Sequence, residues 1–261
     1  MNTQAGQAQD PPRKTITVQE ALQNGLRHHN AGELREAAAI YRRVLNAQPD
    51  NTDALHLLGV VARQSGQPDT AIQLIRRAIA GNERNATYHG NLGTAYEASG
   101  RPDEALAAYR RAIEVDPDYA DAHFKLAAAL DRAGEYQDAL AAYRRTVEIN
   151  PDMHMGQLKY GELLRKANDV DGAIAALTKA TELAPDDADS HYQLGLALKK
   201  AGRGPDCVAS FRRAAQAKPD HDAALFDLTL ALWQMKDVKG LLEACDECLA
   251  ADPGNRRMLA G

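Results

Sequence analysis

Cysteine and histidine are the residues of this chain whose spacing first points to chemistry. Cys245 and Cys248 form a C-x-x-C sequence, which occurs in redox sites and in zinc sites, and Cys207 is the third cysteine. Among the eight histidines, His28 and His29 are adjacent. Adjacent residues point to different sides of a helix, so on a helix these two do not easily share a metal ion. The elements that carry these residues therefore decide whether any of them forms a site.

Motifs of nucleophilic catalysis and of phosphate binding do not occur in the sequence. It contains no G-x-S-x-G, no G-x-x-x-x-G-K-[ST], no G-x-G-x-x-G and no H-E-x-x-H. Three cysteines in 261 residues fit a reducing compartment better than a disulfide framework. We therefore expect a chain that has no catalytic residues, no metal site and no cofactor.

Proline marks an internal period of 34 residues. Six prolines fall on this period, with Glu83 at the one skipped point: Pro49, Pro117, Pro151, Pro185, Pro219 and Pro253. When these prolines are counted as position 32, the chain divides without insertion or deletion into seven repeats: 18–51, 52–85, 86–119, 120–153, 154–187, 188–221 and 222–255. Self-similarity of this length indicates an architecture of stacked repeats.

Small residues recur on the same period. Position 8 of the repeats is Gly25, Gly59, Gly93, Ala127, Gly161, Gly195 and Thr229. Position 15 is Gly32, Gly66, Gly100, Gly134, Asn168, Gly202 and Lys236. Apolar residues at helical spacing precede position 15, where glycine ends a helix in a left-handed turn, and a second amphipathic run follows. Each repeat is thus predicted to be a helix–turn–helix unit, with small residues at positions 8 and 20 where its two helices approach closely.

These residues resemble the tetratricopeptide repeat family over residues 18–255. The resemblance implies an all-α fold, a right-handed superhelical solenoid of seven helix–turn–helix repeats. Its first helices would line a concave groove, and its second helices would cover the outside. One repeat cannot bury its own apolar face, so neighbouring repeats must stack. We expect residues 1–17 to be a flexible N-terminal tail and residues 256–261 a C-terminal tail.

The repeat pattern also assigns the histidines and cysteines. Three histidines occupy position 4, where the family usually has a large aromatic residue packed between helices: His89, His123 and His191. The cysteines at positions 20, 24 and 27 face inward on second helices, and the C-x-x-C lies near a helix C-terminus, whereas a redox thiolate needs a helix N-terminus. We therefore interpret both sets as packing residues.

Charge and hydropathy narrow the classes of partner. The chain has 31 Lys and Arg against 36 Asp and Glu, a net charge of −5, which argues against a nucleic-acid binder that depends on a basic surface. No stretch approaches the roughly 20 apolar residues that span a bilayer. The polar N-terminus lacks the apolar core of a secretory signal. We therefore expect a cytoplasmic chain that neither binds nucleic acid nor inserts into a membrane.

In the geometry that the resemblance implies, positions 2, 5, 6, 9, 12 and 13 of the first helices face the groove. The apolar floor at positions 5 and 9 supplies these predicted partner contacts, with His56 among them: Leu22, His56, Phe124, Leu158, Tyr192, Leu196 and Phe226. Asn91 at position 6 is the single match to the asparagine ladder of the sugar-transferase type of array. This floor suits an amphipathic helix or an extended peptide of a partner protein.

Basic residues at positions 12 and 13 form the predicted rim of the groove: Arg63, Arg165, Lys199 and Lys200. Such a rim would steer a partner that carries acidic groups. Basic residues at helix C-termini also complement the helix dipole, and this alternative accounts for the charges without a partner.

Three functions remain open from the sequence. The leading hypothesis is a non-catalytic protein–protein interaction scaffold that binds a partner peptide or helix in its concave groove. Arrays that resemble this one often precede a catalytic domain in bacterial glycosyltransferases or oxygenases, so an N-terminal substrate-recruiting module of a larger bacterial enzyme is an alternative. Repeat 7 departs most from the pattern and carries the only tryptophan, Trp233, so self-association through this C-terminal repeat is another.

Overall fold

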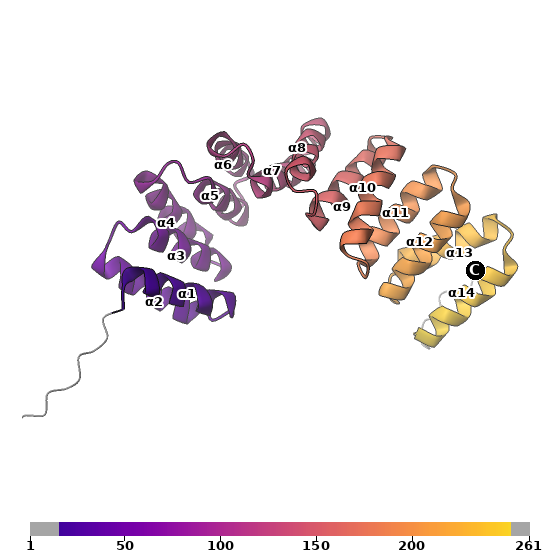
Figure 1. The fold of residues 1–261 in the computed structure, drawn as a ribbon, viewed down its shortest axis with the longest axis horizontal. Coiled ribbons are helices and arrows are strands. Elements are labelled where there is room, and N and C mark those ends of the chain that lie inside the picture. The colour runs from indigo at the N-terminus through magenta and orange to yellow at the C-terminus, as the bar shows by residue number, and fades with distance from the viewer. Residues whose placement is uncertain (1–15, 252–261) are drawn as a thin grey trace, which may run out of the picture. The chain divides into compact units, whose positions relative to one another are not determined.

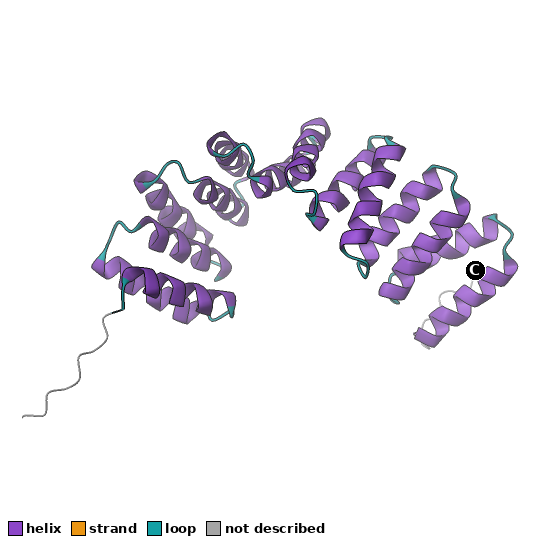
Figure 2. Cartoon of the chain, viewed as in Figure 1, coloured by secondary structure: helices purple, strands orange, loops and turns teal. Residues whose placement is uncertain are grey.

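The computed structural model describes residues 16–251, without the side chains of 248–251 (Figure 1). Within this range the chain forms helices joined by short loops and no strand, which confirms the predicted all-α fold class (Figure 2). Residues 1–15 of the predicted N-terminal tail, Pro253 and the predicted C-terminal tail 256–261 lie outside the described residues. The chain forms two compact units, unit 1 ending at Val115 and unit 2 beginning at Asp116, which are described separately.

Unit 1 consists of three helix pairs in the described residues: α1 (Val18–Asn30), α2 (Leu34–Ala47), α3 (Thr52–Gln64), α4 (Pro68–Gly81), α5 (Ala86–Ala98) and α6 (Pro102–Val115). The helices of each pair pack against each other, and each pair packs on the next. First helices of neighbouring repeats also touch, as α1 with α3 and α3 with α5.

Unit 2 continues the pattern with four helix pairs: α7 (Ala120–Ala133), α8 (Tyr136–Ile149), α9 (His154–Lys166), α10 (Val170–Leu183), α11 (Ala188–Lys200), α12 (Gly204–Ala217), α13 (Asp222–Gln234) and α14 (Val238–Ala251). The first helix of a pair begins every 34 residues, from Val18 to Asp222, so the predicted period of seven helix pairs is confirmed. None of the helices in the described range has the length and apolar character needed to span a bilayer.

The turn inside each helix pair has the left-handed backbone that the glycine pattern predicts. The φ angle at position 15 is between +73° and +81° at the five glycines. Asn168 and Lys236 adopt the same conformation, with φ of 69° and 57°. Because a Cβ disfavours this region, glycine is the residue that ends the first helix at the lowest cost.

Close packing explains the small residue at position 8. A Cβ on Gly93 would lie 2.5 Å from the ring of Tyr109, and one on Gly59 would lie 2.6 Å from Ile75. Both partners occupy position 24 of the second helix. The carbonyl oxygen of Ala71, at position 20, is 3.3 Å from the same point on Gly59. Position 8 therefore faces a large side chain at position 24 as well as the small residue at position 20 that the sequence pattern paired with it.

The polar residues at position 4 hold the loop that precedes their helix. Each bonds at 2.8 to 2.9 Å to the carbonyl oxygen six residues earlier, His89 to Glu83, His123 to Pro117, Gln157 to Pro151 and His191 to Pro185. Because glutamine makes the same bond as histidine, the ring serves as a hydrogen-bonding group between neighbouring repeats. This structural role agrees with the interpretation of these histidines as packing residues.

The two cysteines with described side chains also pack on second helices. Cys207 is buried, its thiol donates to the carbonyl oxygen of Gly204 at 3.1 Å, and burial raises the thiol pKa. Cys245 is half-buried, and the side chain of Cys248 lies outside the described residues. Within the described range, no three His, Cys, Asp or Glu side chains are grouped to hold a metal ion.

The N-terminus of α1 is fixed by a capping box. The Thr17 hydroxyl accepts a hydrogen bond from the Glu20 backbone N–H at 3.2 Å, and the Glu20 carboxylate accepts one from the Thr17 N–H at 2.7 Å. The sequence analysis assigned Thr17 to the flexible tail. In the structure this residue instead has a defined role at the start of the first repeat.

Candidate functional site

The predicted contact residues divide between two surfaces. Unit 1 carries Leu22, His56, Arg63 and Asn91 on α1, α3 and α5. Unit 2 carries Phe124, Leu158, Arg165, Tyr192, Leu196, Lys199, Lys200 and Phe226 on α7, α9, α11 and α13. We call the surfaces formed by positions 2, 5, 6, 9, 12 and 13 of these helices the first-helix face of unit 1 and the first-helix face of unit 2.

On the first-helix face of unit 1, the buried His56 belongs to a network of polar side chains. Asn91 Nδ2 donates to His56 Nε2 at 2.8 Å, and the imidazole lies 4.6 Å from the Tyr88 ring, centroid to centroid. The Tyr88 hydroxyl donates to the Asp53 carboxylate at 2.6 Å. Burial lowers the pKa of His56 to about 4, although Asp53 opposes the shift. The ring is therefore neutral at pH 7, which leaves Nε2 free to accept the amide hydrogen.

The other predicted residues of unit 1 lie around this network. Leu22 is half-buried and packs against the core of α2 and α3, while Leu26, one turn later, is 42% exposed. Arg63 is half-buried at the C-terminal end of α3. His56 is only 8% exposed, and the Asn91 amide already donates to it. The polar groups at the centre of this face thus satisfy one another and offer little to a partner.

On the first-helix face of unit 2, Tyr192 and Asp227 occupy the same repeat positions, 5 and 6, as His56 and Asn91 in unit 1. The Tyr192 hydroxyl donates to Asp227 Oδ2 at 3.1 Å, and Lys199 Nζ donates to Asp227 Oδ1 at 2.8 Å. The Asp227 side chain is 14% exposed. Burial and the nearby Asp227 carboxylate raise the pKa of Tyr192. Lys199 was predicted to belong to the basic rim, but its charge is balanced by Asp227 within the face.

The side chains of Arg165 and Lys200 bind neutral acceptors on this face. Arg165 Nη2 donates to the Gln193 amide oxygen at 3.1 Å, and Lys200 Nζ donates to the Arg165 carbonyl oxygen at 3.2 Å. Both acceptors are neutral, and no carboxylate within residues 16–251 forms an ion pair with either cation. The Nε atom of Arg165 is buried and has no hydrogen-bond partner among the described atoms. These two cations are therefore the part of the predicted rim that can attract an acidic group.

The predicted apolar contacts differ widely in exposure. Leu158 is 3% exposed and belongs to the core, so it offers no surface to a partner. Phe124 is half-buried with its ring edge-on to Tyr143, and Leu196 is half-buried against the core. Phe226 on α13 is 67% exposed. Among the predicted apolar contacts of unit 2, Phe226 is therefore the most accessible anchor.

Two exposed apolar side chains of this face were not among the predicted contacts. Met155 at position 2 of α9 is 44% exposed, and Trp233 at position 12 of α13 is 71% exposed. Phe226, Leu230 and Trp233 lie at i, i+4 and i+7 and so share one side of α13. Positions 2 and 12 carry charged residues in other repeats, and the apolar residues Met155 and Trp233 at these positions are the sequence signal for both contacts.

Models of repeat families match much of the sequence. The model described as tetratricopeptide repeat matches residues 91–154 and 192–256, and one described as TPR repeat matches residues 161–202. The model described as anaphase-promoting complex, cyclosome, subunit 3 matches residues 30–112. No curated protein matches the chain in sequence.

Solved structures share the arrangement of helix pairs. YrrB, described as a TPR protein with an unusual peptide-binding site, is 19% identical over 72% of this chain and 96% of its own, with a TM-score of 0.61. PilF of Pseudomonas aeruginosa is 19% identical over 79% of this chain and 94% of its own, with a TM-score of 0.72. The C-terminal part of a repeat protein from Cytophaga hutchinsonii is 12% identical over 91% and 98%, with a TM-score of 0.72. At these identities the likeness shows the fold alone.

Proposed function

Because the chain belongs to the tetratricopeptide repeat family, we propose that it is a non-catalytic scaffold that binds a segment of a partner protein on the first-helix face of unit 2. The observation that carries this proposal is the side chain of Phe226, which is 67% exposed on a helix whose other face is buried. Large exposed aromatic side chains on a folded scaffold favour contact with another molecule. The proposed place of action is the cytoplasm.

Charge specifies the chemistry of the partner segment. Arg165 and Lys200 have only neutral acceptors, whereas Lys199 is paired with Asp227. An acidic side chain on the partner would give Arg165 a charge-assisted hydrogen bond. The partner that fits this face best is therefore a protein segment with one acidic and one large apolar side chain, rather than a nucleic acid.

Spacing sets the length of that segment. Arg165 lies on α9 and Phe226 on α13, with α11 between them. At the usual spacing of about 10 Å between packed helices, the two anchors are roughly 20 Å apart, which an extended segment of about six residues spans. The likeness to YrrB, whose description includes a peptide-binding site, is in keeping with this mode of binding.

Random-sequence peptides displayed on phage, selected on the full chain, test the proposal. Enriched peptides are expected to combine an acidic with a large apolar residue. Fluorescence anisotropy with a labelled enriched peptide should then show that Phe226→Ala weakens binding about tenfold, as loss of an exposed anchor does. Arg165→Gln should also weaken it, with the larger effect at low salt because the contact is ionic.

Tyr136 provides the matched control. It is an aromatic residue of unit 2 that is 56% exposed, but it lies on the second helix α8. Tyr136→Ala should leave peptide affinity unchanged. Peptides whose binding depends on Tyr136 and not on Phe226 or Arg165 would contradict the assignment of the binding face, and so would a selection that enriches no peptide.

A further inference from the structure

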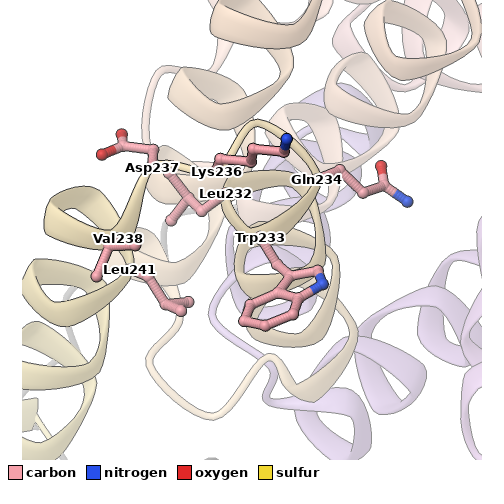
Figure 3. A pocket seen from close by; sticks show the side chains of 7 residues that line it. All are labelled: Leu232, Trp233, Gln234, Lys236, Asp237, Val238 and Leu241. Atoms are coloured by element: carbon pink, nitrogen blue, oxygen red, sulfur yellow. The ribbon is translucent and has the colours of Figure 1, made fainter.

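Among the described residues, an apolar surface is exposed where α13 meets α14. Trp233, Val238 and Leu242 are 71%, 66% and 62% exposed. A pocket of about 420 Å³ between the two helices is lined by Leu232, Trp233, Gln234, Lys236, Asp237, Val238 and Leu241 (Figure 3). We call the surface formed by Trp233, Val238, Leu241 and Leu242 the α14 face.

The residues equivalent to Leu242 in the first two repeats are buried. Leu242 occupies position 21, where Ala38 and Ile72 are 7% and 4% exposed. Those two residues lie on α2 and α4, which pack against the first helix of the following repeat, α3 and α5. The α14 face therefore has the apolar character of a surface that a further helix covers.

The first helix of the array, α1, is polar at positions where the other first helices are mostly apolar. Glu20, Asn24 and Arg27 occupy positions 3, 7 and 10 of α1. The other six first helices have Ala, Tyr, Gly or Ser at position 3, Leu or Tyr at position 7, and Ala, Val or Leu at position 10. A head-to-tail contact between two copies would thus bury Glu20 and Arg27, whose desolvation is costly. Contact between two α14 faces buries apolar surface on both sides instead.

The charges beside the α14 face are complementary under two-fold symmetry. Lys239 and Asp246 are seven residues apart on α14 and so flank Leu242 on one side of the helix. A base early in the helix and an acid late in it oppose the helix dipole, so the dipole does not account for them. When two copies of α14 pack antiparallel about an axis near Leu242, Lys239 lies opposite the partner's Asp246. Lys239 Nζ lies 3.7 Å from the Glu243 carboxylate one turn along its own helix, and its side chain is 89% exposed, so the ammonium can also reach a carboxylate of a second copy.

We propose that the α14 face is the interface of a symmetric dimer, in which its occupant is a second copy of this chain. Leu242 packs near the two-fold axis, Trp233 and Val238 extend the apolar contact, and Lys239 pairs with Asp246 of the partner subunit. A two-fold contact uses the same patch on both subunits and closes at two copies. This inference goes beyond the proposed function: Trp233 borders both surfaces, but Phe226 and Arg165 take no part in the interface.

Sedimentation equilibrium of the full chain over a concentration series tests the dimer. The wild type is expected to reach twice the monomer mass, and Leu242→Glu to raise the dissociation constant at least a hundredfold. Since Leu242 is already exposed, the variant should keep the circular dichroism of the wild type. Leu26→Glu, at a 42% exposed leucine of unit 1, is the matched control and should leave the mass unchanged.

A charge exchange tests the antiparallel arrangement. Lys239→Glu and Asp246→Lys should each weaken the dimer about tenfold, and the two together should restore most of the affinity. Emission of Trp233, the only tryptophan, should shift to shorter wavelength as the dimer forms. A monomeric mass at every concentration would overturn the proposal, as would a dimer that withstands Leu242→Glu or is not restored by the charge exchange.

Leu242 and Phe226 each belong to one of the two surfaces, so variants at these residues separate this outcome from that of the peptide experiment. Leu242→Glu should bind a selected peptide as the wild type does, and Phe226→Ala should dimerise as the wild type does. Loss of both properties in either single variant would show that one surface serves both roles, and would overturn the assignment of the α14 face to self-association alone.

Discussion

Units 1 and 2 bring the same two positions of the repeat together and use them for different chemistry. In unit 1, His56 at position 5 meets Asn91 at position 6 of the next first helix, and in unit 2 Tyr192 meets Asp227. Both pairs are 35 residues apart. The unit 1 pair is neutral and includes the buried His56, whereas the unit 2 pair includes a carboxylate that also binds Lys199.

The difference shows how a repeat protein separates structure from specificity. The helix stack determines which side chains touch, since position 5 of one first helix contacts position 6 of the next in both of these pairs. The residues at those positions then determine whether the contact responds to pH, to salt or to neither. Unit 1 places a titratable group with a low pKa there, and unit 2 places an ion pair.

The largest expected difference between the units is the response of unit 1 to acid. The pKa of His56 is about 4 in the folded chain, below its ordinary value of 6.5, so protonation favours the unfolded state. The stabilisation is complete above pH 6.5 and is lost as the pH falls toward 4, by about 3 kcal/mol in total. Urea denaturation followed by circular dichroism between pH 7 and pH 4.5 measures this loss.

His56→Gln isolates that contribution, since glutamine offers Asn91 an acceptor without a titrating group. The free energy of unfolding of the wild type should exceed that of the variant at pH 7 and approach it as the pH is lowered. Carboxylates elsewhere titrate in both proteins and cancel from the difference. Two pH curves that run parallel would show that His56 is not the titrating group.

In unit 2 the expected response is to salt. Asp227→Asn leaves Tyr192 an acceptor but removes the charge opposite Lys199, so stability at low salt should fall by about 1 to 2 kcal/mol, and added salt should reduce the difference. Asn91→Ala in unit 1 should cost about 1 kcal/mol at every salt concentration, because both partners are neutral. Urea denaturation of both variants at low and high salt makes the comparison, and equal salt dependence would contradict it.

A double variant tests the ion pair itself. Lys199→Met together with Asp227→Asn should cost less than the sum of the single changes, since each single change leaves one charge unpaired. Additive costs would mean that the 2.8 Å contact between Lys199 and Asp227 contributes no coupling energy.

The sequence was sufficient to predict the helix pairs, because each depends on residues that repeat at the same position. Gly134 and the equivalent glycines end first helices, and the period of 34 places every pair. The partners of the site residues were not predictable in this way. His56 meets Asn91 and Tyr192 meets Asp227 across 35 residues, one more than the period, so comparison of equal positions does not reveal them.

The exposure of the position 5 side chains could not be predicted from the sequence pattern either. Leu158, Tyr192 and Phe226 share position 5, yet Leu158 is 3% exposed and Phe226 is 67% exposed. The ion pair between Lys199 and Asp227 likewise could not be predicted, because the two residues belong to different repeats.

The smallest expected difference concerns the turn inside the last repeat of each unit. Gly100 in unit 1 and Lys236 in unit 2 have the same left-handed backbone, with φ of 73° and 57°. A residue with a Cβ loses roughly 1 kcal/mol of stability in this region. Replacing it by glycine removes this strain but raises the entropy of the unfolded chain, which offsets part of the gain in stability. Lys236→Gly should therefore stabilise the protein by about 0.5 kcal/mol, and Gly100→Lys should destabilise it by about 1 kcal/mol. Lys236→Ala is the control, because alanine removes the charge and keeps the Cβ. If urea denaturation shows that alanine and glycine raise the free energy of unfolding equally, the cost lies in the lysine charge and not in the backbone.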